Sequence, residues 1–154
     1  EADPGGRLPI TFPKTTGLLP LYYNHKPTGR SDHTFRAYRD LWGKDEIEFP
    51  FGYGLSYTTF HYGDICVTPD RITQYKTVNV SIEVNNSGDR QGEEVVQLYL
   101  RKPYSAVTRP VKQLKAFRRI SLQPGESQSV TFLLGEEELK FLDRHLDQNN
   151  PNII

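Results

Sequence analysis

Hydrophobic and polar residues alternate with a period of two through much of the second half of the chain. Residues 77–84 place four aliphatic side chains on one face and polar groups on the other: Val78, Val80, Ile82 and Val84. This alternation is typical of a strand with one buried face. Turn-forming residues occupy 85–89, and residues 94–101 return as a second strand. Its inward side chains are Val96, Leu98 and Leu100.

Further strands are predicted on both sides of this pair. Residues 60–68 form an earlier strand, and a strand near 113–122 follows a loop flanked by proline. A Gln-Pro-Gly turn then leads to a strand over 127–134, whose inward side chains are Val130, Phe132 and Leu134. Short successive strands with Pro and Gly turns favour an antiparallel β-sandwich over βαβ units, so the chain is predicted to be mainly β.

The pattern changes after the last of these strands. Glu136–Glu138 beside Leu139 predict one acidic turn of helix, since the positive end of a helix favours carboxylates. Phe141 and Leu142 are expected to return to the core.

The first part of the chain has little periodicity. From Glu1 to about Lys44, prolines and glycines interrupt every candidate element. The same stretch nevertheless carries many large apolar side chains, among them Leu8, Phe12 and Trp42, which a segment in water would not retain. A long irregular stretch is unusual inside an independent compact domain, so this one is expected to lie on the surface of another domain.

An aromatic segment, Phe49–Phe60, separates the irregular part from the strands. Gly52 and Gly54 give its backbone freedom, while Phe51, Tyr53 and Tyr57 carry more apolar surface than a mobile linker exposes. We therefore expect the segment to be docked. An aromatic turn that enters the β-domain and an aromatic platform that stacks on a ligand both remain open.

Composition and charge narrow the possible partners. The chain has 154 residues, with 19 basic and 19 acidic side chains, so no basic surface predicts nucleic acid as a partner. No apolar run reaches the length of a membrane span, and the first residues lack the features of an export signal, as in an internal fragment. The single cysteine, Cys66, cannot form an internal disulfide and is predicted to be a small buried strand residue.

Several motifs in sequence order carry a family resemblance. The FPFGYGLSYTTF segment over 49–60 resembles the connector that joins the α/β core domain of glycoside hydrolase family 3 enzymes to their fibronectin type III-like domain. Residues 6–13 and 20–30 are similar to the end of that core domain, and residues 109–117 and 122–126 are similar to the β-domain. The resemblance spans nearly the whole chain and extends to bacterial periplasmic β-glucosidases.

The resemblance implies both a fold and a division of the chain. The fold is a fibronectin type III-like, immunoglobulin-like antiparallel β-sandwich, preceded by an irregular segment from an α/β domain. Residues 1–48 are the tail of the α/β-sandwich core domain, 49–60 the aromatic connector, and 61–154 the fibronectin type III-like domain without its last strand. An open sheet edge and self-association of the chain on its own are expected from that missing strand.

The resemblance also implies a function for the parent enzyme: a retaining exo-β-glucosidase that releases terminal non-reducing glucosyl residues, without a cofactor, in the bacterial periplasm or outside the cell. The chain is then its non-catalytic C-terminal part, because the family's aspartate nucleophile and glutamate acid/base lie before Glu1. Its expected partners are the remainder of the enzyme and the oligosaccharide substrate, with neither nucleic acid nor membrane.

The residues themselves predict no catalytic, cofactor or metal site. Glycoside hydrolysis uses two carboxyl groups on either side of the scissile bond. Glu93 and Glu94, adjacent on a strand, point to opposite faces, and Glu136–Glu138 suit a helix start. The four histidines have no metal-ligand spacing: His25, His33, His61 and His145. Ser105 and Ser127 have no recognisable base nearby.

Three alternatives to a β-glucosidase part remain. A β-xylosidase part shares the same β-domain. A stand-alone carbohydrate-binding module would use exposed tyrosines, for which Tyr22, Tyr23, Tyr99 and Tyr104 are the candidates. An interaction module is disfavoured, because such modules follow short polar linkers rather than an aromatic-rich stretch.

Overall fold

The computed structural model describes residues 3–27, 47–69, 77–102, 104–105, 107–139, 141–142 and 148–149. The chain divides into two compact units, each built from separate stretches of sequence. The sandwich unit comprises Glu1–Gly5, Ser56–Leu98 and Lys115–Ile154. The irregular unit comprises Gly6–Leu55 and Tyr99–Leu114.

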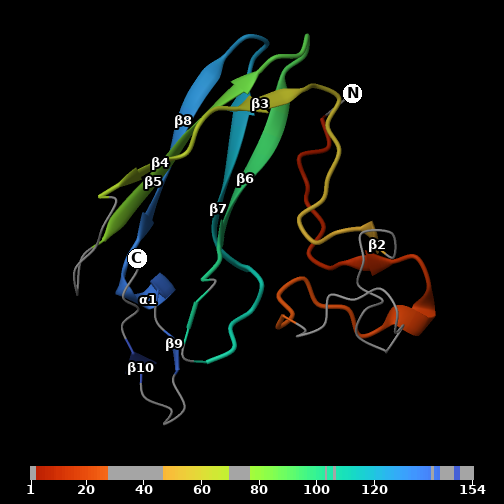
Figure 1. Cartoon of the computed structure of the whole chain (residues 1–154). Coiled ribbons are helices and arrows are strands. Elements are labelled where there is room, and N and C mark those ends of the chain that lie inside the picture. Colours follow the sequence, from red (N-terminus) through yellow and green to blue (C-terminus); the bar gives the residue numbers. More distant parts are fainter. Residues whose placement is uncertain are drawn as a thin grey trace. The chain divides into compact units, whose positions relative to one another are not determined.

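The larger sheet of the sandwich unit is organised around β5 (Val78–Asn86). On one side β5 pairs antiparallel with β8 (Ser127–Leu134), in a register that runs from Val78↔Leu134 to Asn85↔Ser127. On the other side it pairs antiparallel with two short strands, β3 (Phe60–Tyr62) and β4 (Cys66–Thr68). Figure 1 shows β5 between β8 and these two edge strands.

The edge of this sheet differs from the prediction of one strand over 60–68. Tyr62 is opposite Val84 and Cys66 is opposite Ser81, so the edge advances by four residues while β5 advances by three. The extra residue breaks the ladder as a bulge does. Gly63 bridges the break by donating its backbone N–H to the carbonyl of Glu83 at 2.9 Å.

The smaller sheet consists of β6 (Gly92–Leu100) and β7 (Gln113–Leu122). Its strands follow the predicted ranges closely because both have one apolar face. The core cluster draws on β5 and β8 from the larger sheet and on β6 and β7 from the smaller one: Val84, Val96, Ile120, Leu122, Val130 and Phe132. Side chains from two sheets thus meet in one interior, which confirms the predicted β-sandwich.

The inward-facing residues of β5 and β8 are mostly those that the alternation predicted. Val78, Val80 and Val84 are buried, as are Val130, Phe132 and Leu134. On β6, Val96 is buried, whereas Leu98 and Leu100 are only half-buried. Glu94 shares the inward face of β6 and is also buried, and its Oε1 accepts a hydrogen bond of 2.8 Å from the Tyr62 hydroxyl.

Beyond β8 the chain forms α1 (Glu136–Leu139), the predicted acidic turn, with Leu139 buried. Glu138 accepts the backbone N–H of Gly135 at 2.8 Å, which satisfies one donor at the start of this turn. β9 (Phe141–Leu142) then pairs antiparallel with β10 (Gln148–Asn149). The rest of 145–154, where the sequence predicts an open edge, lies outside the described residues.

In the irregular unit, two segments distant in sequence run side by side. β1 (Phe12–Pro13) pairs antiparallel with β2 (Ile47–Phe49), and a 3-10 turn, η1 (Thr16–Leu18), follows β1. Leu8 exchanges backbone hydrogen bonds with the connector, donating to Tyr53 and accepting from Gly52, both at 2.8 Å. Gly52 has φ of 82°, a left-handed conformation that glycine adopts without strain.

Candidate docking surface

An aromatic cluster of three half-buried residues, Tyr23, Phe51 and Tyr99, lies in the irregular unit. Tyr23 and Phe51 stack with ring centroids 4.0 Å apart, and Tyr99 meets both rings edge-on at 6.2 and 6.5 Å. Lys112 places its Nζ 5.0 Å from the centroid of the Tyr99 ring, within range of a cation–π contact. The backbone N–H of Leu114 donates to the Tyr23 hydroxyl at 3.2 Å.

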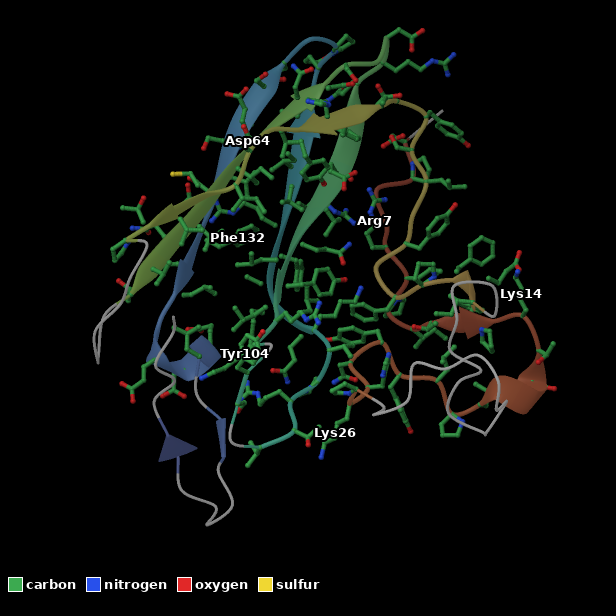
Figure 2. All side chains as sticks on the ribbon, viewed as in Figure 1. Arg7, Lys14, Lys26, Asp64, Tyr104 and Phe132 are labelled. Atoms are coloured by element: carbon green, nitrogen blue, oxygen red, sulfur yellow. The ribbon has the colours of Figure 1, made fainter. Side chains whose placement is uncertain are left out.

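This cluster changes the interpretation of the four tyrosine candidates for sugar binding. Tyr23 and Tyr99 direct their rings at each other and at Phe51, and both are half-buried. Tyr22 is exposed, and Tyr104, labelled in Figure 2, is the most exposed of the four. Two of the four tyrosines therefore serve packing rather than an open stacking face.

Burial raises the pKa of the Tyr99 phenol above its ordinary value, and the neighbouring Tyr23 raises it further. A raised pKa gives stability that is fully present below the pKa of the unfolded chain, about 10, and lost as the pH rises through the folded value. Tyr99→Phe is therefore expected to reduce the loss of stability above about pH 10. Urea unfolding at pH 8 and at pH 11 measures the effect, and an identical loss in wild type and variant would refute it.

An apolar groove of about 570 Å³ opens on the irregular unit. It is lined by Gly6, Arg7, Leu8, Phe12, Phe49, Tyr53, Gly54 and Leu55. Phe49 and Tyr53 contact each other with ring centroids 5.1 Å apart, so the groove has an aromatic wall. A β-carbon at Gly54 would collide with the Gly6 carbonyl oxygen, so this wall requires a glycine.

The groove residues expose much apolar surface to solvent. Leu55 is 66% exposed, and Phe12, Phe49 and Tyr53 are also exposed. Ile10, Leu19 and Tyr22 add further exposed apolar side chains in the same unit. Contiguous apolar surface of this kind marks an interaction site on a folded protein. Within the connector, Phe51 is half-buried while Tyr53 and Tyr57 are exposed in this chain.

The carboxylates considered for catalysis have structural partners instead. Glu93 lies on the outer face of β6, where its Oε2 is 3.3 Å from Nη1 of Arg119. Glu94 is on the opposite, inner face with Tyr62. The strand thus separates two adjacent acids, as the sequence predicted.

The histidine and serine candidates are scattered. His25 is beside the Lys26 carbonyl, and His61 is exposed on β3. His33 and His145 lie outside the described residues. Ser127 accepts a hydrogen bond from Asn85 at 2.9 Å, and Ser105 is exposed in a loop. Over the part of the chain that the structure describes, no group of acids, histidines and cysteine has the arrangement of a metal site.

The prediction that Cys66 is buried is wrong. Cys66 is exposed on β4, where its Sγ lies 3.8 Å from Oγ1 of Thr68. All three residues of β4 are exposed, and among the described residues this short strand pairs only with β5, at the edge of the larger sheet. Alternation alone cannot distinguish such an edge from a covered strand.

No helix among the described residues is long and apolar enough to cross a membrane.

Comparison with known proteins gives matches of two kinds. The family model for the fibronectin type III-like domain matches residues 94–149. Over 95% of its length the chain is 40% identical to a periplasmic β-glucosidase of Salmonella typhimurium and 41% identical to a β-xylosidase of Formosa agariphila. In both cases it spans only 20% of the relative's length.

The solved structures agree with the sequence matches. A β-glucosidase from Erythrobacter marinus superposes with a TM-score of 0.84 at 39% identity, over 97% of this chain and 19% of that one. A β-glucosidase from Listeria innocua in complex with glucose superposes with a TM-score of 0.86 at 36% identity, over 97% of this chain and 21% of that one. The chain therefore corresponds to about one fifth of these proteins.

Proposed function

Since the chain belongs to the family of β-glucosidases and β-xylosidases that carry a fibronectin type III-like domain, we propose that it is the non-catalytic C-terminal part of a retaining exo-β-glucosidase of glycoside hydrolase family 3. The parent enzyme hydrolyses terminal non-reducing β-D-glucosyl residues, in the periplasm or outside the cell. Residues 1–48 belong to its α/β core domain, 49–60 to the connector and 61–154 to the fibronectin type III-like domain.

The apolar groove carries this proposal. Its aromatic wall and the exposed Leu55 give the chain a surface that a partner must cover, and the relatives are about five times longer than the chain. The partner is the remainder of the same enzyme, which supplies both catalytic carboxyl groups and the oligosaccharide site. Without that partner, the same groove leads the chain to associate with copies of itself.

A β-xylosidase part is the second candidate. The relative from Formosa agariphila, at 41% identity, is a β-xylosidase, and the relative from Salmonella typhimurium, at 40%, is a β-glucosidase. The residues of this chain do not discriminate glucose from xylose, since they form packing surfaces rather than a sugar-cleaving pocket.

The test reconstitutes the enzyme from two pieces, this chain and the polypeptide that precedes it in the parent. The chain alone is expected to hydrolyse neither p-nitrophenyl β-D-glucoside nor the xyloside, and the mixture is expected to hydrolyse one of them. Leu55→Asp places a charge in the groove and should weaken association of the two pieces at least about tenfold, because burying an unpaired carboxylate is costly.

Leu133→Asp is the matched control, because Leu133 is 62% exposed on β8, close to the 66% of Leu55, but lies outside the groove. It should change association by less than about twofold. Equal losses in the two variants would refute the groove as the docking surface. Hydrolysis by the chain alone, abolished by substitution of one of its own acids, would refute the non-catalytic role.

A further inference from the structure

A separate cavity, of about 480 Å³, lies within the sandwich unit. Its lining residues come from four distant parts of the sequence: Asp3, Tyr57, Arg90, Gln91, Gly92, Glu93 and Ser121. The volume lies within the range of roughly 300–1,000 Å³ that small-molecule sites occupy. Neither the docking surface nor the proposed role of the chain uses this cavity.

The walls of the cavity are held in place by the carboxylate of Asp3. It accepts hydrogen bonds from the hydroxyl of Ser56 at 2.9 Å, the backbone N–H of Tyr57 at 2.7 Å and the backbone N–H of Glu93 at 3.0 Å. A further hydrogen bond holds the segment after Asp3, since Arg119 donates to the Gly5 carbonyl at 3.3 Å. The site is therefore preorganised, which lowers the entropic cost of binding a ligand.

Gly92 forms part of the lining at the start of β6. A β-carbon at this position would crowd the methyl group of Thr58, the ring of Phe60 and the carboxylate of Asp3. Glycine therefore allows the backbone to approach these three groups closely.

The groups that the cavity offers to a ligand are polar and aromatic. Tyr57 is 57% exposed, so much of its phenol surface is open to contact. The Nε2 of Gln91 donates to the Ser121 hydroxyl at 3.2 Å, which leaves the Gln91 amide oxygen as an acceptor and the Ser121 hydroxyl hydrogen as a donor. The Arg90 guanidinium, 64% exposed, lies at the long distance of 3.9 Å from Asp89 and can donate to a ligand as well.

The lining carries two acidic side chains, Asp3 and Glu93, and one basic side chain, Arg90. Both carboxylates already bond to protein groups: Glu93 lies 3.3 Å from Arg119, and Asp3 accepts hydrogen bonds from Ser56 and from two backbone N–H groups. A phosphate would face two carboxylates and one arginine, and the described residues hold no cluster of metal ligands, so the lining favours an uncharged ligand. A neutral ligand that offers an apolar ring face together with several hydroxyl groups fits these partners.

We propose that this cavity binds a neutral saccharide, with one pyranose ring packed against Tyr57 and its hydroxyl groups bonded to Arg90, Gln91 and Ser121. The apolar face of the sugar ring covers the Tyr57 phenol, while its hydroxyl groups form hydrogen bonds with the side chains of Arg90, Gln91 and Ser121. The proposal concerns binding only and does not depend on which glycoside the parent enzyme cleaves.

The experiment titrates the purified chain with cellotetraose and with xylotetraose, followed by calorimetry and by perturbation of the amide signals. Saturable binding of at least one of them is expected, with shifts at residues 57, 90–93 and 121. Tyr57→Ala and Arg90→Met should each weaken binding at least about tenfold. Thermal unfolding checks that both variants fold, which is expected because Asp3 bonds the backbone rather than the ring of Tyr57.

Tyr22→Ala is the matched control, since Tyr22 is 61% exposed but lies outside the cavity. It should change affinity by less than about twofold. An equal loss for Tyr22→Ala, or no saturable binding of either saccharide up to roughly 10 mM, would overturn the site. A neutral ligand also predicts affinity that is independent of salt, so a steep fall between about 50 and 500 mM NaCl would overturn the assignment.

Because binding is measured on the chain alone, failure here would leave the proposed role in the parent enzyme unaffected. Failure of the two-piece reconstitution would likewise leave this site standing.

Discussion

Asn86→Ala is expected to lower the free energy of unfolding of the sandwich unit by about 3–5 kcal/mol. The Asn86 side chain is fully buried, with 0% exposure, and its amide makes four hydrogen bonds. Its Nδ2 donates to the carbonyls of Arg90 and Leu122 at 2.7 and 3.0 Å. Its Oδ1 accepts from the Thr58 hydroxyl at 2.6 Å and the Gly88 N–H at 3.1 Å.

These contacts make Asn86 the junction of three segments at one end of the sandwich. The amide ties the residues before β3, the turn between β5 and β6, and the end of β7 to one another. Alanine would leave four polar groups without this partner, and each buried group that stays unsatisfied costs about 1–3 kcal/mol. The expected loss of unfolding free energy is smaller than the sum of these four costs, because water and small local movements replace some of the lost hydrogen bonds.

Asn85→Ala is the matched control for this prediction. Asn85 is adjacent and also bonds through its Nδ2, to the carbonyls of Gly125 and Glu126 and to Ser127. It is only half-buried, so water can replace these partners, and we expect a loss of about 1 kcal/mol or less. Urea unfolding followed by circular dichroism measures both variants. Equal losses for the two asparagines would contradict the junction role of Asn86.

Phe132→Ala is expected to cost about 3–5 kcal/mol of the same free energy. Phe132 lies on β8 with 6% exposure and belongs to the core cluster between the two sheets. Arg118 from β7 lies 6.0 Å from the centre of its ring and covers it on one side. Removal of the ring leaves a cavity that strands fixed by their ladders cannot collapse to fill.

The neighbouring Leu133 provides the control on the same strand. It is 62% exposed on the opposite face, so Leu133→Ala should change the free energy of unfolding by less than about 1 kcal/mol. Similar losses for Phe132→Ala and Leu133→Ala would show that the interior does not lie on the side of β8 that the alternation indicates.

The family resemblance was available from the sequence and is confirmed by the matches to β-glucosidases and β-xylosidases. It rests on long motifs, such as the connector over 49–60, whose order along the chain is specific. No comparable signal marked the saccharide cavity, whose residues belong to four separate stretches of sequence.

The sequence by itself determined which face of β5 and which face of β8 is buried. Val80 and Val84 on β5, and Val130 and Phe132 on β8, follow from an alternation of period two, because successive side chains of a strand point to opposite sides. The sequence also determined the single helical turn at Glu136, because the preference of a helix start for acidic side chains depends only on nearby residues.

Only the tertiary structure decided how the polar and edge residues are used. Asparagine is a turn-forming residue type, so the sequence predicts Asn86 in a turn. In the structure its buried side chain joins two distant segments, because it bonds to the Thr58 hydroxyl and to the Leu122 carbonyl. Cys66 has the pattern of a buried strand residue but is exposed on β4, a short strand at the edge of the larger sheet. Alternation reports that a residue faces one side of its strand, whereas burial and hydrogen bonding depend on what packs there from elsewhere in the chain.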